Sequence, residues 1–163
     1  MKTLIIMRHG KSELHKSGLD DFDRSLMPRG VNNAGDMGKY IAEKWGTPDI
    51  ILSSAAARAH QTAILAAKNM NYPQENIMTD EKLYLLSGYS ILRALSKLSD
   101  NYQSCLLVGH NPGLTDLVNL LGVKLDNLPT GSAVCFSFEI SSWKEISGDY
   151  RINFSGMKLA REL

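Results

Sequence analysis

The segment "CLLVGHNPGLTDLVNL", residues 105–120, decides the fold class of this chain. Cys105 to Val108 form an apolar run that predicts a buried strand. Asn111 can cap a following helix, and Pro112 suits the first turn of that helix. The helix would carry an apolar stripe of Leu114, Leu117, Val118 and Leu121. A buried strand that leads directly into an amphipathic helix is typical of α/β proteins.

Two other segments show the same order of strand and helix. Thr3 to Met7 predicts a buried strand that ends at His9 and Gly10, and after a polar loop a helix follows Pro28 and ends near Trp45 and Gly46. We expect Val31, Ala34, Met37 or Gly38, and Ile41 on its buried face. Asp49 to Leu52 predicts another strand, with Ser53 or Ser54 as the N-cap of an alanine-rich helix over residues 55–70.

The rest of the chain continues this alternation. We expect a brief strand over Asn76 to Thr79 and a helix after Ser90. Two closing strands cover about Ala133 to Ile140 and Tyr150 to Phe154. The sequence therefore predicts one α/β domain over residues 1–163 with a largely parallel central sheet.

Composition excludes several classes of function. The chain has 163 residues, 44% of them hydrophobic and 21% charged, and a formal net charge of +1. Acidic and basic residues are interspersed, so no basic stripe suggests nucleic acid or an anionic membrane as a partner. The apolar start is too short for a signal sequence, and we expect a cytoplasmic protein. Cys105 and Cys135 lie in apolar segments and are expected to be buried structural thiols.

Two histidines mark the candidate site. His9 and His110 each follow a predicted buried strand, and ligands of open α/β sheets bind at the carboxyl ends of the strands. If the two strands are neighbours, the imidazoles face each other across one crevice. Arg8 lies beside His9, and Arg58 lies in the opening turn of a helix, where a cation opposes the helix macrodipole. A local preference broken in this way is expected at a functional site.

These residue types suit a dianionic phosphate. Guanidinium groups match phosphate oxygens, and Gly10 would let the backbone approach the ligand closely. In this positive field a histidine is held neutral, so His9 can attack phosphorus as a nucleophile. Arg8, Arg58 and a protonated His110 would stabilise the transferring phosphoryl group. No metal or other cofactor is needed.

Three other functions stay open at this point. A mutase that transfers phosphate between hydroxyls is disfavoured, because the chain has little extra sequence to enclose the site from water. A binding module would retain the pocket with little turnover. A metallohydrolase would use the histidines and the aspartates of the first loop as ligands, although these residues have no recognised metal-binding spacing. Each histidine taken alone could also be an ordinary histidine at a strand end.

Three motifs give the chain a family resemblance. "MRHGKS" at 7–12, "SSAAARAHQTA" at 53–63 and "LLVGHNP" at 106–112 resemble the histidine phosphatase superfamily, which has the phosphoglycerate mutase-like fold. "DRSLMPRG" at 23–30 and "NFSGMKLA" at 153–160 look most like the SixA-type phosphohistidine phosphatases. The resemblance implies a three-layer α/β/α sandwich and a protein phosphohistidine or a small phosphate ester as substrate.

The resemblance also assigns roles to residues. It implies that His9 is phosphorylated transiently, that Arg8 and Arg58 grip the phosphoryl group, and that His110 is the second histidine of the pocket. Substrate contacts are expected at Gly10, Ser12 and His15, although the last stands where many relatives have asparagine.

The chain departs from the superfamily pattern at the proton donor. Tyr84 and Leu85 occupy the positions where many relatives have a glutamate that protonates the leaving group, and SixA-type proteins also lack that acid. Asp20, Asp21 and Asp23 are alternative donors, or they form a solvated acidic loop. Met27 replaces the usual threonine helix cap.

Overall fold

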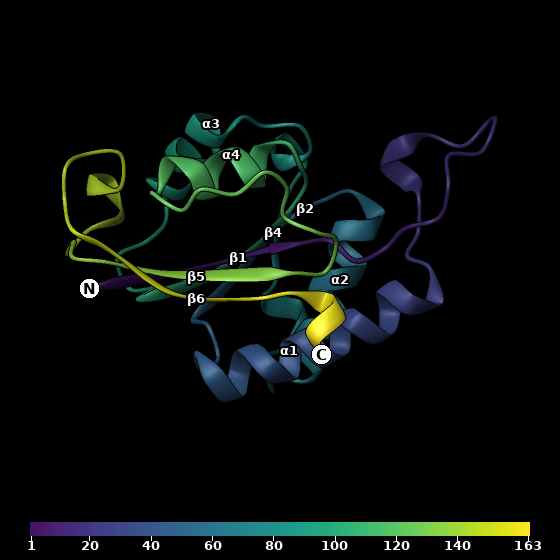
Figure 1. Ribbon diagram of the computed structural model, residues 1–163, viewed down its shortest axis with the longest axis horizontal. Coiled ribbons are helices and arrows are strands. Elements are labelled where there is room, and N and C mark those ends of the chain that lie inside the picture. The colour runs from purple at the N-terminus through teal and green to yellow at the C-terminus, as the bar shows by residue number, and fades with distance from the viewer.

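The computed structural model describes residues 1–163, and it has a six-stranded sheet with helices on both faces (Figure 1). The strands are β1 (Lys2–Arg8), β2 (Ile50–Ser54), β3 (Met78–Asp80), β4 (Ser104–Gly109), β5 (Ala133–Phe138) and β6 (Ile152–Lys158). The helices are α1 (Pro28–Lys44), α2 (Ala57–Lys68), α3 (Gly88–Leu95) and α4 (Gly113–Leu120). The predicted α/β fold is confirmed.

The sheet is mixed, with the strand order β3-β2-β4-β1-β5-β6. The first four strands in this order are parallel, and the two closing strands β5 and β6 run antiparallel to their neighbours. β1 and β4 are hydrogen-bonded neighbours in a register that pairs Met7 with Val108 and Arg8 with Gly109. The expected adjacency of the two strands that precede His9 and His110 is therefore confirmed.

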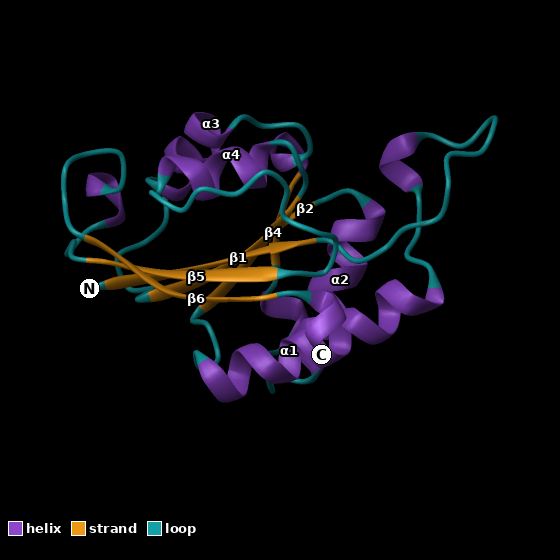
Figure 2. Ribbon diagram, viewed as in Figure 1, coloured by secondary structure: helices purple, strands orange, loops and turns teal.

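Each face of the sheet buries its own apolar core. α1 and α2 cover one face, and α3 and α4 cover the other, as Figure 2 shows. The first face packs Met37 and Ile41 of α1 against the alanines of α2, and the second packs the leucines of α3 and α4 against β1 and β4. Cys105 and Cys135 are free and buried, one in each core, as expected for structural thiols. These two cores complete the three layers.

Glycines inside α1 permit two close backbone contacts. A Cβ atom on Gly38 would collide with the backbone of Ala66 in α2, and one on Gly30 would collide with the backbone of Lys11. The glycines that weaken α1 as an isolated helix therefore let it pack tightly against α2 and the loop after β1.

Several predicted boundaries were wrong. Ser53 and Ser54 belong to β2, and the N-cap of α2 is Ala56, whose side chain makes no capping bond. α3 starts before Ser90, because the hydroxyl of Ser87 accepts a hydrogen bond from the Ser90 amide. Val31 is 39% exposed, since the adjacent Gly30 faces the interior instead.

The closing strands also differ in extent from their predicted ranges. β5 stops at Phe138, and β6 begins at Ile152 and continues to Lys158. A register shift between Cys135 and Phe136 interrupts their pairing.

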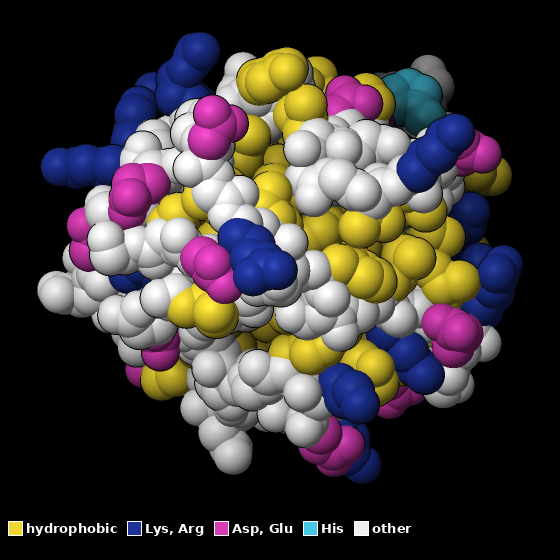
Figure 3. Space-filling model, turned by 60° about the vertical axis from the view of Figure 1, so that its left-hand side comes forward, with side chains coloured by type: hydrophobic (Ala, Val, Ile, Leu, Met, Phe, Trp, Pro, Cys, Tyr) yellow, Lys and Arg dark blue, Asp and Glu magenta, His cyan; other side chains and the backbone are white.

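The surface has mixed charge on the face seen in Figure 3, where basic and acidic side chains are interspersed among hydrophobic atoms. No helix combines the length and the apolar character needed to cross a membrane.

Candidate active site

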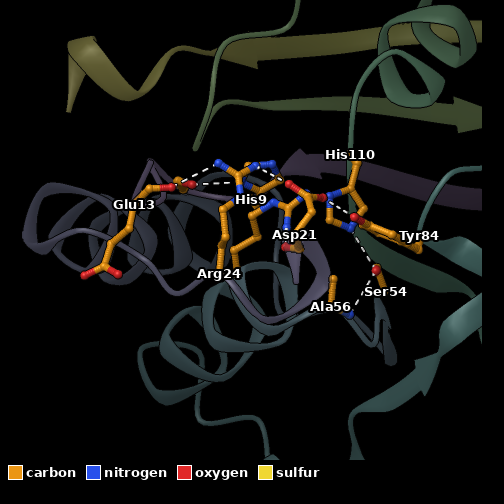
Figure 4. Close-up of polar contacts among 10 residues, drawn as sticks. His9, Glu13, Asp21, Arg24, Ser54, Ala56, Tyr84 and His110 are labelled. Atoms are coloured by element: carbon orange, nitrogen blue, oxygen red, sulfur yellow. Dashed lines mark hydrogen bonds and ion pairs between the residues drawn. The ribbon is translucent and has the colours of Figure 1, made fainter. Parts of the chain in front are cut away.

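The parallel pairing of β1 and β4 brings the two histidines together. His9 and His110 follow the two strands directly, and both are 6% exposed. Their ring centroids lie 5.1 Å apart with the planes tilted by 51° (Figure 4). The crevice expected at the carboxyl ends of the strands is present.

A backbone contact fixes the tautomer of His9. Its Nδ1 lies 2.8 Å from the carbonyl oxygen of Gly10, which can only accept a hydrogen bond. Nδ1 therefore carries the proton and donates it to Gly10. The other ring nitrogen, Nε2, is left with a lone pair, as a nucleophile requires.

The surroundings of His9 keep its ring neutral. Burial, together with the positive charges of Arg58, Arg8 and Arg24, lowers the pKa of His9 to about 4, although the bond to Gly10 opposes the shift. Near neutral pH the imidazole is therefore neutral, with its one proton on Nδ1 and the lone pair of Nε2 free to attack.

His110 is also neutral in the free protein. Burial lowers its pKa to about 3, and His9 and Arg58 add to the effect. Its Nε2 lies 2.8 Å from the hydroxyl oxygen of Ser54, which accepts a hydrogen bond from the Ala56 amide. If the Ser54 hydroxyl donates to Nε2, the His110 proton resides on Nδ1. The expected protonated His110 therefore requires a bound anion to raise its pKa.

Both predicted arginines, Arg8 and Arg58, lie beside the two histidines. Arg8 ends β1 and donates from Nη1 to the Leu128 carbonyl at 3.0 Å. Arg58 lies in the first turn of α2 and is 5% exposed. Thr62 links α2 to the loop after β1, because its hydroxyl donates to the Arg58 carbonyl and accepts from the Gly10 amide.

These side chains line one cavity of about 290 Å³. Its walls are formed by Arg8, His9, Lys11, Ser12, Leu14, Arg24, Arg58, Leu85, His110, Asn111 and Thr130. The structure thus gathers the two histidines, the two arginines and Ser12 among the predicted residues. No carboxylate is part of this lining.

Two predicted substrate contacts lie elsewhere. His15 is exposed in the loop after β1 and does not line the cavity. Gly10 is buried behind the cavity with its amide already bonded to Thr62. A Cβ atom on Gly10 would collide with the backbone of Gly30, so the close approach that needs glycine is to α1 rather than to a ligand.

Arg24, Asp21 and Tyr84 form a set of contacts at the site and were not among the predicted catalytic and binding residues. Arg24 lines the cavity and pairs with Asp21, with 2.8 Å between Nη2 and Oδ1. Tyr84 packs edge-on against His110, with ring centroids 5.3 Å apart, and its hydroxyl donates to Asp21 (Figure 4). The "DRSLMPRG" stretch was the available signal for Arg24, and Asp21 and Tyr84 were considered only in relation to the proton donor.

Four buried polar atoms without a hydrogen-bond partner surround this cavity. They are Nε of Arg8, Nε of Arg24, Nε of Arg58 and Nδ1 of His110, and no other buried side-chain nitrogen or oxygen of the chain lacks a partner. Protein covers these atoms, and a buried polar atom left unpaired costs about 1–3 kcal/mol, so the walls of the cavity carry an unfavourable polar arrangement. The cavity itself is lined by the cationic side chains of Arg8, Lys11, Arg24 and Arg58, which suit an anionic ligand.

Comparison with known proteins agrees with this geometry. Residues 4–84 match the model of the histidine phosphatase superfamily (branch 1). An uncharacterized protein of Mycobacterium tuberculosis is 34% identical over 115 residues, which are 71% of this chain and 69% of that protein. The chain belongs to the histidine phosphatase superfamily.

Among solved structures, SixA proteins are similar to this chain in fold. SixA of Agrobacterium tumefaciens is 26% identical, with a TM-score of 0.79 over 96% of this chain and 97% of that one. The protein histidine phosphatase SixA complexed with tungstate has a TM-score of 0.81 at 20% identity over 98% and 97% of the two chains, and shows the shared fold. The recognised family and the phosphoglycerate mutase-like fold are confirmed.

Proposed function

We propose that this histidine phosphatase hydrolyses a phosphoryl group, without a metal, through a phosphohistidine intermediate on His9. The observation that carries the proposal is a cavity in which a neutral histidine with a free Nε2 lies among cationic side chains. Arg8, Lys11, Arg24 and Arg58 line this cavity together with His110. A phosphoryl group offers the negative charge and the oxygen acceptors that suit these groups.

The first step is transfer to His9. The lone pair on Nε2 attacks phosphorus, a bond from nitrogen to phosphorus forms, and the bond to the leaving group breaks. The guanidiniums of Arg8 and Arg58 stabilise the charge on the equatorial oxygens. In the second step a water oxygen attacks phosphorus, Nε2 leaves with its electron pair, and inorganic phosphate is released.

The leaving group favours protein phosphohistidine as the substrate. An alkoxide leaving group needs a proton from a general acid, and the cavity lining holds no carboxylic acid. Asp21, the nearest candidate, is held ionised because its pKa is lowered by the Tyr84 hydrogen bond and the adjacent arginines. An imidazole is a far weaker base than an alkoxide and needs less help to depart. Similarity to SixA proteins supports the same substrate class.

Phosphate release tests the proposal. The substrates are a phosphohistidine peptide and an aryl phosphate, each with excess chelator, and the proteins are wild type and His9→Ala. We expect peptide turnover that survives chelation and is lost in the variant. Turnover of the aryl phosphate alone would point to a small-molecule ester. Loss of activity on chelation would support a metallohydrolase, and no turnover by wild type would leave a phosphate-binding module.

A further inference from the structure

Asp21 makes more contacts with the site than any other acidic residue. Arg58 donates from Nη2 to its Oδ2 at 3.1 Å and from Nη1 to its backbone carbonyl at 2.7 Å. Arg24 pairs with Oδ1 at 2.8 Å, and the Tyr84 hydroxyl donates to Oδ2. Figure 4 shows Asp21 with Arg24, Tyr84 and the two histidines around it.

These contacts hold both guanidiniums in the same manner. The two terminal nitrogens of Arg58 bond Asp21, and those of Arg24 bond Asp21 and the Glu13 carbonyl. In each arginine the Nε donor is buried and unpartnered. A guanidinium is planar, so fixing its terminal nitrogens also fixes the direction of the remaining donors.

The carboxylate also changes the charge of the site. Arg8, Lys11, Arg24 and Arg58 bring four positive charges to the cavity, and Asp21 is the one acidic residue paired with any of them. Its negative charge repels an anion in the cavity. It therefore weakens the binding of an anion that is already formed, such as inorganic phosphate, while it orders the arginines for the transferring group.

We propose that Asp21 is a positioning residue that orients Arg58 and Arg24 for phosphoryl transfer and lowers the affinity of the site for product phosphate. The proposal rests on the phosphatase function proposed above. The proposal predicts opposite effects on kcat and on phosphate affinity when Asp21 loses its charge. A loop residue that matters only for folding would weaken both. Loss of the charge should lower kcat and strengthen the binding of phosphate.

Asp21→Asn tests this directly, because the amide has the shape of the carboxylate without its charge. We expect kcat to fall about tenfold or more, because the arginines lose their fixed geometry. We expect the dissociation constant of inorganic phosphate, measured by calorimetry, to fall at least about threefold. Asp21→Glu restores the charge and should return phosphate affinity toward that of wild type.

Controls come from the same loop and from the third contact. Asp20 and Asp23 are exposed, so Asp20→Asn and Asp23→Asn should behave as wild type in both measurements. Tyr84→Phe removes only the hydroxyl contact and should reduce kcat less than Asp21→Asn. Weaker phosphate binding in Asp21→Asn would overturn the proposal, and so would an unchanged kcat. Calorimetry with phosphate needs no turnover, so it tests the charge effect even if the proposed activity is absent.

Discussion

His9 and His110 face each other at 5.1 Å from the ends of two adjacent parallel strands, and each ring is held neutral by the environment that the pair shares. Two protonated imidazoles at this separation would repel each other and the nearby guanidiniums. The free site therefore combines neutral rings with cationic arginines. This combination leaves His9 nucleophilic and still attracts an anion.

Replacing His9 should abolish turnover. In His9→Ala the nucleophilic nitrogen is absent, and we expect phosphate release to fall to background. Wild type quenched during turnover should carry acid-labile phosphate that the variant lacks. His15→Ala is the matched control, because that histidine is exposed outside the cavity and its loss should leave the rate unchanged. Full activity in His9→Ala would refute the phosphohistidine mechanism.

Replacing Arg58 should remove stabilisation of the transition state. We expect Arg58→Ala to lower kcat/KM by about 10²–10³-fold, the effect of deleting one preorganised charge contact. Steady-state kinetics with a fixed substrate measures the change. Arg29→Ala is the control, since Arg29 is exposed on α1 and does not line the cavity. A loss below tenfold would mean that Arg58 does not contact the reacting group.

The sequence predicted that His9, His110, Arg8 and Arg58 come together in one cavity, because three of them lie at strand ends. Local pattern alone places His9 and His110 after buried strands, and it places Arg58 at the start of the helix that follows β2. The pairing of β4 with β1 and with β2 then brings these three residues together. The contacts of Asp21 were harder to predict. They join a polar loop to α2 and to Tyr84, which lies 63 residues after Asp21 in the sequence. No periodicity in the sequence predicts these contacts.

Local rules also misplaced two residues near the site. Ser54 has the side chain of an N-cap, and sequence preference assigned it to the helix, whereas the strand continues through it and its hydroxyl bonds His110. Gly10 suits close backbone approach, which the structure uses for packing against Gly30. In both cases the residue type was understood correctly, and its partner was set by tertiary contacts.

Removing the Ser54 hydroxyl should impair the site through His110. Ser54→Ala leaves Nε2 of His110 without its partner, so no hydrogen bond at this nitrogen fixes the tautomer and orientation of the ring. We expect kcat to fall about three- to tenfold, with a smaller change in KM. Ser53→Ala is the matched control, because that buried hydroxyl donates to the Ser54 carbonyl and not to His110. Equal losses in the two variants would contradict a role through His110.

The low pKa of His9 should make stability depend on pH in a defined window. The pKa is about 4 in the folded protein and about 6.5 in the unfolded chain, so below pH 6.5 the unfolded state binds the extra proton. Stability is therefore lost as the pH falls from 6.5 toward 4. From these values we expect His9 alone to lower the free energy of unfolding by about 2 kcal/mol between pH 7 and pH 5.

Urea unfolding of wild type and His9→Gln, in buffers without phosphate or sulfate, isolates this contribution. Groups that do not interact with His9 titrate equally in both proteins, so the difference between their free energies of unfolding should shrink by about that amount over the window. His110, whose pKa His9 lowers, adds a smaller change in the same direction. Adding phosphate should stabilise wild type more than His9→Gln, because the bound anion favours the intact site. A difference that does not change with pH would show that His9 titrates normally and is not held neutral by burial and the nearby arginines.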